Sequence, residues 1–476
     1  MTSHNEDNSG ARHGGLDGAR KRRVAIVFGT RPEVIKLVPV LMELRRLAAA
    51  RTPIEVVTVS TGQQADLLSQ TLAFFELVPD RELTTPIDDD LAVRHGQLVA
   101  ELGGLFAAER IERVLVQGDT TSAFAAALAA FYAGIPVDHI EAGLRTGDLA
   151  APFPEELHRR CIAACARLHF CPTAGARANL VAEGIAPRDI LVVGNTVIDA
   201  MRLVEDRIVA PACLPPPRGP RLFVTVHRRE NLPHLDNGIL AGLLRVLVQV
   251  PDVELVVAVH PNPAVRGPLR DRLSGHPRVH LVEPLGYAET LGLVRSSTLV
   301  VTDSGGLQEE ATALGTPVVV LREATERVEA VQAGNALLVG TTAPEVARHI
   351  GRILADSELR GRMARPSDVF GDGFAAQRIV GWLCAAMEVD RGAATATAAA
   401  TATATETSAA TATETSAATT TATETTTATE TSAATTTATE TTTETTTETT
   451  TATTAVAAAP AAGTGAGAAG TKREAS

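Results

Sequence analysis

Short runs of consecutive apolar residues recur along the chain, and each leads through a small-residue turn into a stretch with helical spacing. The first run, Val24–Phe28, has no polar interruption, which is typical of a strand covered on both faces of a parallel sheet. It ends at Gly29, and a helix is predicted to about Ala49, with Pro32 in its first turn, where proline is tolerated. The alternation of strand and helix predicts a doubly wound α/β fold with right-handed crossovers.

The remaining elements fall into two series of similar size. In the first series, strands are expected at 54–60, 114–117 and 136–140, with helices ending near Phe75, Glu109 and Tyr132. In the second series, strands are expected at 222–226, 255–259, 279–282, 298–301 and 317–321, with helical stretches between them. Each series is a Rossmann-like unit. Two such units are expected to face each other across a cleft, with ligands beyond the carboxyl ends of the strands.

Five prolines between Pro211 and Pro220 predict a stiff linker and a domain boundary. The predicted segments are a disordered N-terminal segment (1–22), an N-terminal Rossmann-like domain (23–198), a C-terminal Rossmann-like domain (199–372), a final helical segment (373–391) and a disordered tail (392–476). The tail consists of near-repeats of Ala, Thr and Glu, so it has too little apolar surface to offset the entropy of ordering. An inert linker is favoured for it over a partner site.

The length and net charge of the chain limit the functions that can be expected. The chain has 476 residues, enough for two or three domains. Half of its net charge of −12 falls in the tail, so the folded part is only mildly acidic and no nucleic-acid partner is expected.

Targeting and cysteine signals point to one compartment. Residues 1–22 have no apolar segment of signal-peptide length, and no run of about 18 apolar residues predicts a membrane span. The five cysteines are odd in number, lack CxxC spacing and are expected to be free thiols in apolar surroundings. A cytoplasmic location is therefore expected.

Polar side chains follow the predicted strands at regular positions. They are Arg31, Asp119, Glu141, His227, His260 and Ser304. Because ligands of doubly wound proteins bind at this edge of the sheet, these residues are candidates for one site. The stretch from Asp303 to Glu310 places a small-residue turn at a helix start, where backbone N–H groups bind phosphate and Glu310 could hold a ribose. The alternative is an ordinary strand-to-helix turn.

The charges in these loops suit chemistry on a diphosphate. Candidate cations are Arg31, Lys36, His227, Arg228, Arg229 and Arg327, although each alone could be a solvated surface charge. Asp119, Glu141 and Glu155 are carboxylates that burial could shift into acid and base roles, and the alternative for Asp119 is a helix N-cap. No metal-ligand spacing, Walker lysine or GxGxxG motif is present, so no metal and no cofactor are expected.

Nine ordered motifs resemble one family. They are Phe28-Gly-Thr-Arg-Pro-Glu33, Gly118-Asp-Thr-Thr121, Glu141-Ala-Gly-Leu-Arg-Thr-Gly-Asp148, Pro154-Glu-Glu156, Gly194-Asn-Thr-Val-Ile-Asp199, His227-Arg-Arg-Glu230, Thr302-Asp-Ser-Gly-Gly306, Gln308-Glu-Glu310 and Thr325-Glu-Arg327. In this order they closely resemble the non-hydrolysing UDP-N-acetylglucosamine 2-epimerases, from about Arg23 to Met387. The resemblance implies a glycosyltransferase-B fold whose last helix crosses back to the N-terminal domain, with closure hinging near Gly194–Asn195 and Gly371–Gly373.

The resemblance also implies an activity. It is the reversible C2 epimerisation of UDP-GlcNAc to UDP-ManNAc, by anti elimination of UDP to 2-acetamidoglucal and re-addition, without metal or nicotinamide. It further implies a homodimer and a supply of ManNAc for envelope polysaccharide. Asp119, Glu141 and Glu155 would be the acid and base groups, with His227 assisting. The implied substrate-binding residues are Arg31, Lys36, Arg145, Arg228, His260, Ser304, Gly305, Gly306, Glu310 and Arg327, with Glu310 on the ribose.

Some positions depart from the family pattern. Leu285 and Thr290 stand where relatives often carry Gln and Phe near the uracil, which would lower base affinity if those side chains contact it. His158 replaces a common Asn and Val328 a Pro. Gln63 matches the pattern of a second, activating UDP-GlcNAc site, but its neighbours Gln64 and Ala65 do not, so regulation stays open.

Three other functions compete with the epimerase. A hydrolysing relative would release free ManNAc and UDP, and the carboxylate set does not separate it from the leading hypothesis. A glycosyltransferase of the same fold would need an acceptor. A nucleotide-sugar-binding regulator or scaffold would need no catalytic groups, so the three intact carboxylate motifs speak against it.

Overall fold

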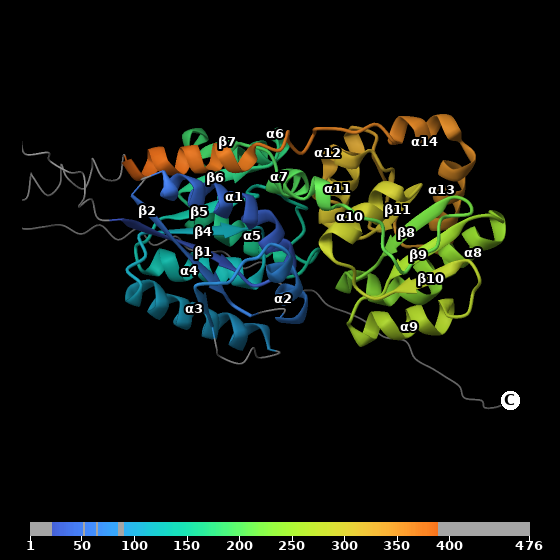
Figure 1. Cartoon of the computed structure of the whole chain (residues 1–476), viewed down its shortest axis with the longest axis horizontal. Coiled ribbons are helices and arrows are strands. Elements are labelled where there is room, and N and C mark those ends of the chain that lie inside the picture. Colours follow the sequence, from blue (N-terminus) through green and yellow to red (C-terminus); the bar gives the residue numbers. More distant parts are fainter. Residues whose placement is uncertain (1–20, 51–52, 63–64, 84–89, 389–476) are drawn as a thin grey trace, which may run out of the picture. The chain divides into compact units, whose positions relative to one another are not determined.

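Two parallel β-sheets organise the chain in the computed structural model, which describes residues 21–50, 53–62, 65–83 and 90–388 (Figure 1). The predicted disorder of residues 1–22 is wrong at Arg22, which is the first residue of strand β1 and pairs with Ile54. Residues 1–20 and the predicted disordered tail lie outside the described residues. The first sheet has the strand order β3-β2-β1-β4-β5-β6-β7, and the second has the order β10-β9-β8-β11-β12-β13. Every strand pairing in both sheets is parallel. The predicted pair of doubly wound α/β domains is therefore confirmed.

The elements of the N-terminal domain alternate as expected. Its strands are β1 (Arg22–Phe28), β2 (Ile54–Ser60), β3 (Arg81–Glu82), β4 (Arg113–Gln117), β5 (Val137–Ile140), β6 (Leu168–Cys171) and β7 (Ile190–Val192). Its helices are α1 (Arg31–Ala49), α2 (Ala65–Phe74), α3 (Leu91–Ala108), α4 (Thr121–Tyr132), α5 (Glu155–Cys165) and α6 (Ala174–Ala182), with a short 3₁₀ turn at Pro187–Asp189. The sequence prediction did not single out the short strands β3, β6 and β7.

The C-terminal domain repeats the plan. Its strands are β8 (Arg221–Thr225), β9 (Glu254–Ala258), β10 (Val279–Val282), β11 (Leu299–Thr302), β12 (Val318–Val320) and β13 (Ala336–Leu338). Its helices are α7 (Thr196–Leu203), α8 (Ala241–Gln249), α9 (Pro263–Leu273), α10 (Tyr287–Ser296), α11 (Gly305–Leu314), α12 (Val328–Gln332), α13 (Ala343–Ala355) and α14 (Ser357–Met363). Short 3₁₀ helices occupy Glu205–Arg207 and Arg229–His234, and a short π-helix occupies Leu235–Leu240.

Strand β1 shows why an uninterrupted apolar run becomes a central strand. Successive side chains point to opposite faces of a sheet, so Val24, Ile26 and Phe28 join one buried cluster, and Ala25 and Val27 join the other. Helix α1 covers the first face, and α3 and α4 cover the second. Because both faces are covered, a polar residue in this strand would have no access to water.

The chain enters the C-terminal domain before its proline-rich segment. Val197 and Met201 of α7 are buried with Phe223 of β8 in one core cluster. The proline-rich segment that follows begins at Pro211 and includes Cys213, which is exposed rather than in apolar surroundings. The exact domain ranges stay predictions, because this packing locates α7 without fixing a boundary.

A helix covering residues 375–388 returns the chain to the N-terminal domain. Ile379, Leu383 and Met387 are buried in the same cluster as Phe28 of β1. In Figure 1 this helix lies beside α1, on the face of the first sheet that α1 covers. The expected crossing of the last helix is confirmed. The predicted hinge segments also meet here, since the Asn195 N–H donates to the Phe370 carbonyl over 2.6 Å.

We expect the returning helix to stabilise the N-terminal domain. Ile379→Ala removes a fully buried side chain and leaves a cavity, so the free energy of unfolding should fall by about 2–4 kcal/mol. Gln377→Ala is the matched control, since Gln377 is exposed on the same helix and should cost less than about 0.5 kcal/mol. Urea unfolding followed by circular dichroism measures both values. Equal effects of the two substitutions would show that this packing is not stabilising.

Candidate active site

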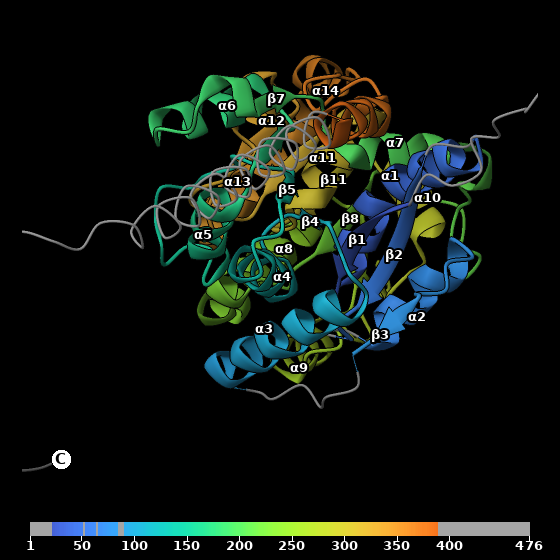
Figure 2. The same ribbon diagram turned by 90° about the vertical axis from the view of Figure 1, so that its left-hand side faces the viewer.

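The predicted site residues lie where the strand order of each sheet reverses. In the first sheet β1 and β4 are neighbours, and Arg31 and Asp119 follow them; in the second sheet β8 and β11 are neighbours, followed by His227 and Ser304. These are the topological switch points at which open α/β sheets bind ligands. Figure 2 looks along the long axis from the side of the first sheet, so α1, β4 and β5 are seen in front of β11 and α11 of the second domain.

Glu141 is held by side chains from several segments of the chain. It follows β5 with a φ of 65°, a left-handed conformation that costs a non-glycine residue about 1 kcal/mol or more. Its carboxylate accepts hydrogen bonds from Lys36 Nζ, from Gln117 Nε2 at 3.1 Å and from Asn195 Nδ2 at 3.2 Å. Such strain persists only where the surroundings enforce it, as these donors do here.

A buried charge cluster joins Glu141 to the C-terminal domain. The Arg327 guanidinium donates to Glu141 over 3.1 Å, to Glu309 over 2.9 Å and to Glu326. Lys36 of α1 also pairs with Glu309, over 3.0 Å. All five side chains are at most 8% exposed. Three carboxylates thus share two cations across the domain interface.

The pKa values of Asp119 and Glu155 are shifted in opposite directions. Burial alone would raise the pKa of Asp119, but Arg159, Arg327 and Arg228 together hold that pKa below its ordinary value. The Arg159 guanidinium lies 2.5 Å from the Asp119 carboxylate. The pKa of Glu155 is raised, mainly by burial and then by the charge of Asp119.

The opposite pKa shifts suggest different acid and base roles for the two carboxyl groups. Glu155 Oε2 is buried and has no hydrogen-bond partner among the described residues. Asp119 is therefore suited to stay a carboxylate, whereas the environment of Glu155 favours its protonated form and suits it to exchange a proton. Asp119 is not the N-cap of α4, because Thr120 occupies that position and its side chain accepts from Ala123 N.

His227 is fixed by the buried carboxylate of Asp303. The Asp303 side chain accepts from the backbone N–H groups of His227 and Arg228 at 3.0 and 2.9 Å, and lies 3.2 Å from His227 Nδ1. The ring of His260 stacks on His227 with centroids 5.7 Å apart. Burial, and then the neighbouring His227, lower the pKa of His260. The ends of β8, β9 and β11 are thereby joined around two imidazoles.

The start of α11 offers unused N–H donors. Ser304 is the N-cap, but its side chain makes no capping hydrogen bond. The guanidinium of Arg327 lies against Gly305, where an added Cβ would come within 2.6 Å of its central carbon. An added Cβ on Gly306 would meet no protein atom within 4 Å. The backbone at Gly306 is therefore open to a ligand, as an anion site at a helix N-terminus requires.

The half-buried Arg31 and the buried Glu310 form a second polar group. Arg31 Nη1 donates to the Leu285 carbonyl over 2.9 Å, so the unusual Leu285 contributes its backbone here. Burial lowers the pKa of Arg31. Burial raises the pKa of Glu310 to about 7, the charge of Glu309 adds to the shift, and Lys36 and Arg31 oppose it.

Arg145 pairs outside this cluster, and a second predicted residue is not described. Arg145 makes a two-pronged ion pair with Glu183, with distances of 2.7 and 2.8 Å. Gln63, the candidate for an activating site, lies outside the described residues. Their assignment stays a prediction from the sequence.

Sequence reasoning missed several residues of the charge cluster. They are Arg159, Glu309, Glu326, Gln117 and Asn195. Arg159 could have been found, because it lies four residues after Glu155 and so shares its face of α5. Glu309 and Glu326 each adjoin a residue that was predicted, but nothing in the sequence marked them as buried.

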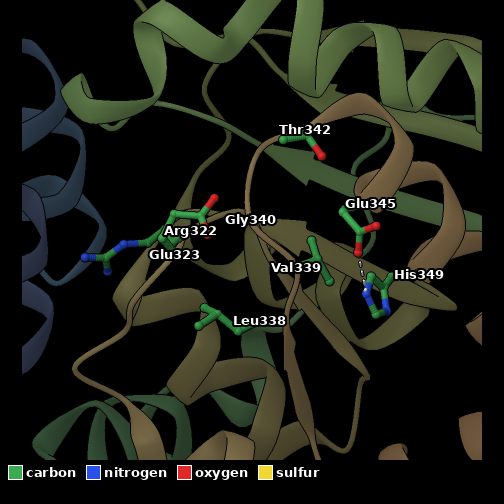
Figure 3. A pocket seen from close by; sticks show the side chains of 8 residues that line it. All are labelled: Arg322, Glu323, Leu338, Val339, Gly340, Thr342, Glu345 and His349. Carbon is green, nitrogen blue, oxygen red and sulfur yellow. Dashed lines mark ion pairs between the residues drawn. The ribbon is translucent and has the colours of Figure 1, made fainter.

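A separate pocket of about 360 Å³ lies in the C-terminal domain. Its walls come from the ends of β12 and β13 and from α13, and none of the predicted site residues lines it (Figure 3). Figure 3 shows the His349 ring beside Glu345, 3.3 Å away. Arg322 links the pocket to the charge cluster, because it also donates to Glu326 over 2.8 Å.

Two negative findings concern the described residues only. No group of three His, Cys, Asp or Glu side chains in this part of the chain is arranged to hold a metal ion. Over the same residues, no helix combines the length and apolar character needed to cross a bilayer.

Known proteins that resemble this chain in sequence carry the name of one family. The family model described as UDP-N-acetylglucosamine 2-epimerase matches residues 46–384. The UDP-N-acetylglucosamine 2-epimerase of Bacillus subtilis is 40% identical over 363 residues, which are 76% of this chain and 94% of that protein.

Two solved structures resemble the fold closely. The Neisseria meningitidis UDP-GlcNAc 2-epimerase bound to UDP-GlcNAc has a TM-score of 0.72 and 37% identity, covering 76% of this chain and 99% of that one. The Methanocaldococcus jannaschii enzyme in complex with UDP-GlcNAc and UDP has a TM-score of 0.66 and 30% identity, covering 76% and 99%.

We expect Glu310 to make stability depend on pH. A carboxyl whose pKa is raised from 4.5 to about 7 on folding stabilises the folded state fully below 4.5, and loses that contribution as pH rises through 7. Glu310→Gln keeps the neutral shape, so it should remove about 2–3 kcal/mol of the fall in unfolding free energy between pH 4.5 and 7.5. Urea unfolding at both pH values measures this difference, and parallel pH slopes for the two proteins would contradict it.

Proposed function

The chain belongs to the UDP-N-acetylglucosamine 2-epimerase family, and we propose that it interconverts UDP-GlcNAc and UDP-ManNAc without releasing the free sugar. The family makes the protein an isomerase. The proposal adds the substrate pair, the route through 2-acetamidoglucal and the absence of hydrolysis. The homodimer, the cytoplasmic location and the supply of ManNAc for envelope polysaccharide stay predictions from the resemblance.

One observation carries the proposal. Two carboxyl groups with opposite pKa shifts, Asp119 and Glu155, lie at the edge of the first sheet, and Arg327 connects this edge to the N-terminus of α11. Epimerisation by elimination needs both parts, because a proton leaves C2 while the C1–O bond to UDP breaks. Acid and base groups must therefore lie beside an anion site, and the arrangement of Asp119, Glu155 and the start of α11 supports that assignment.

We assign the diphosphate to the start of α11. The N–H groups at Gly305 and Gly306 point along a helix dipole that favours negative charge. Arg327 donates one hydrogen bond to each of three carboxylates, so we assign it the role of orienting them. Arg228 is freer: its closest acidic neighbour, Glu326, is 3.7 Å away, and its Nε has no partner among the described residues. Arg228 is therefore the better candidate to neutralise the leaving UDP.

The carboxylates then divide the proton transfers. In the elimination, one group takes the C2 proton, the electron pair forms the C1–C2 double bond, and UDP departs with the C1–O electrons. In the second step, UDP adds back to C1 of the glucal and a proton is delivered to C2 from the opposite face. Asp119 and Glu155 are the exchanging pair, and Glu141, fixed by its donors, orients the sugar. His227, set by Asp303, lies beside the departing diphosphate.

The glucal intermediate must be kept from water until UDP adds back to it. Contacts from Arg327 to Glu141, from Lys36 to Glu309 and from Arg31 to the Leu285 carbonyl all cross between the domains. We propose that these contacts form on closure around the substrate, with the hinge at Gly194–Asn195 and Gly371–Gly373.

Isotope exchange tests the reaction. The purified protein in D₂O should equilibrate UDP-GlcNAc with UDP-ManNAc and place deuterium at C2 of both, because the proton is lost to and regained from solvent-exchanged carboxyls. Glu155→Gln and Asp119→Asn should each lower kcat by about 10²–10⁴-fold, the usual contribution of a positioned acid or base. Proton NMR of the sugar signals measures turnover and deuterium together.

Three results would point elsewhere. Epimerisation with full retention of the C2 proton would exclude the elimination route. Free ManNAc with stoichiometric UDP would identify a hydrolysing enzyme. Unchanged UDP-GlcNAc that is consumed only when an acceptor is added would identify a glycosyltransferase.

A single methyl group tests the diphosphate site. Gly306→Ala adds a Cβ that meets no protein atom, so the fold should tolerate it, but the methyl should displace a phosphate bound at this N-terminus. The Kd for UDP should rise by about tenfold or more, equivalent to about 1.4 kcal/mol. Calorimetric titration measures this, and Gly267→Ala, an equally open helical position in α9, is the control. Equal UDP affinity of all three proteins would place the diphosphate elsewhere.

A further inference from the structure

Three aromatic rings from successive helices form a stack beside the catalytic carboxylates. The ring of His95 in α3 stacks on Phe124 in α4 with centroids 4.5 Å apart, and Phe124 lies 5.1 Å from the ring of His158 in α5. His158 is 5% exposed. Neither ring nitrogen of His95 has a partner among the described residues, so His95 contributes ring contact rather than hydrogen bonds.

The imidazole of His158 also makes a polar contact toward the site. Its Nδ1 lies 2.8 Å from the backbone carbonyl oxygen of Asp119. Since a carbonyl only accepts, Nδ1 must carry the hydrogen, and this selects one tautomer of the neutral ring. Burial lowers the pKa of His158, and the charge of Arg159 lowers it further, whereas the Asp119 carbonyl and carboxylate raise it.

The neighbouring residue holds the other end of Asp119. Arg159 contacts the Asp119 carboxylate at 2.5 Å and is itself braced by Glu156 at 3.0 Å. Two consecutive residues of α5 thus fix the main chain and the side chain of Asp119. Glu155 is the first residue of the same helix. The distance between the two exchanging carboxyl groups is therefore set by one rigid element.

We propose that His158 is a positioning residue for Asp119, which rests on the proposed epimerase function. Its Nδ1–H fixes the loop after β4, and the ring stack fixes its own orientation. An Asn Nδ2 occupies nearly the same position relative to Cβ as His Nδ1, so an amide could make the same bond. The functional part of the side chain is the donor, and the ring adds rigidity.

Three substitutions separate the donor from the ring. His158→Asn keeps a donor without the ring, His158→Phe keeps a ring without the donor, and His158→Ala removes both. If His158 positions Asp119, kcat should fall by about 10–100-fold in the Phe and Ala proteins with KM within about threefold, because small displacements of a catalytic group cost about that much. The Asn protein should stay within about threefold of wild type.

The pattern reverses if the side chain only fills space. In that case the Phe protein would keep full activity, and the Asn and Ala proteins would lose the same activity and thermal stability; this result overturns the proposal. If the Phe protein does not fold, the comparison of Asn with Ala decides, since both lack the ring and only Asn restores a donor. Equal losses in Asn and Ala would also overturn it.

A second measurement separates this proposal from the function on which it rests. Nitrogen-15 NMR of imidazole-labelled protein should show His158 as the Nδ1–H tautomer, and an Nε2–H tautomer would contradict the hydrogen bond whatever the activity. Wild-type protein that fails to epimerise UDP-GlcNAc, with the Nδ1–H tautomer present, would overturn the proposed reaction and the catalytic purpose of the contact. Active wild type with tolerance of Phe would overturn only the role of His158.

Discussion

The sharing of two buried cations by three buried carboxylates is the constraint on which the arrangement of the two domains depends. Arg327 and Lys36 each contact one carboxylate of the N-terminal domain, Glu141, and one of the C-terminal domain, Glu309. Removing such charges from water costs about as much as their attraction returns. The cluster therefore specifies this arrangement of the two domains without holding it strongly, which is the balance that the proposed opening and closure requires.

The same cluster explains why three carboxyl groups close together acquire different properties. Arg159 and Arg327 act on Asp119 and lower its pKa. Burial raises the pKa of Glu155, and one buried oxygen of Glu155 has no hydrogen-bond partner in the described part of the chain. Glu141 is surrounded by donors and is the fixed member. Residue type alone would make these groups equivalent, so the difference comes from the positions of the guanidinium groups.

The sequence predicted what depends on local pattern. Uninterrupted apolar runs such as 24–28 gave the strands, and polar residues after them gave the site edge, because parallel strands place their carboxyl ends together. Short strands such as β7 were missed, since three residues carry too little periodicity. Glu309 and Glu326 were missed because their burial and pairing follow from contacts between distant segments, which no local pattern encodes.

The proposed hinge and the proposed catalytic site meet in Asn195. Its backbone N–H donates to the Phe370 carbonyl, where the two chain crossings touch, and its side chain caps α7 through Val197 N. The Nδ2 of the same side chain donates to Glu141 over 3.2 Å. Gly194 and Gly371, both with positive φ, pack so closely that a Cβ on either would contact the other's Cα. Rotation about the proposed hinge would therefore move a donor of Glu141 directly, so the proposed closure and the position of this carboxylate are coupled through one side chain.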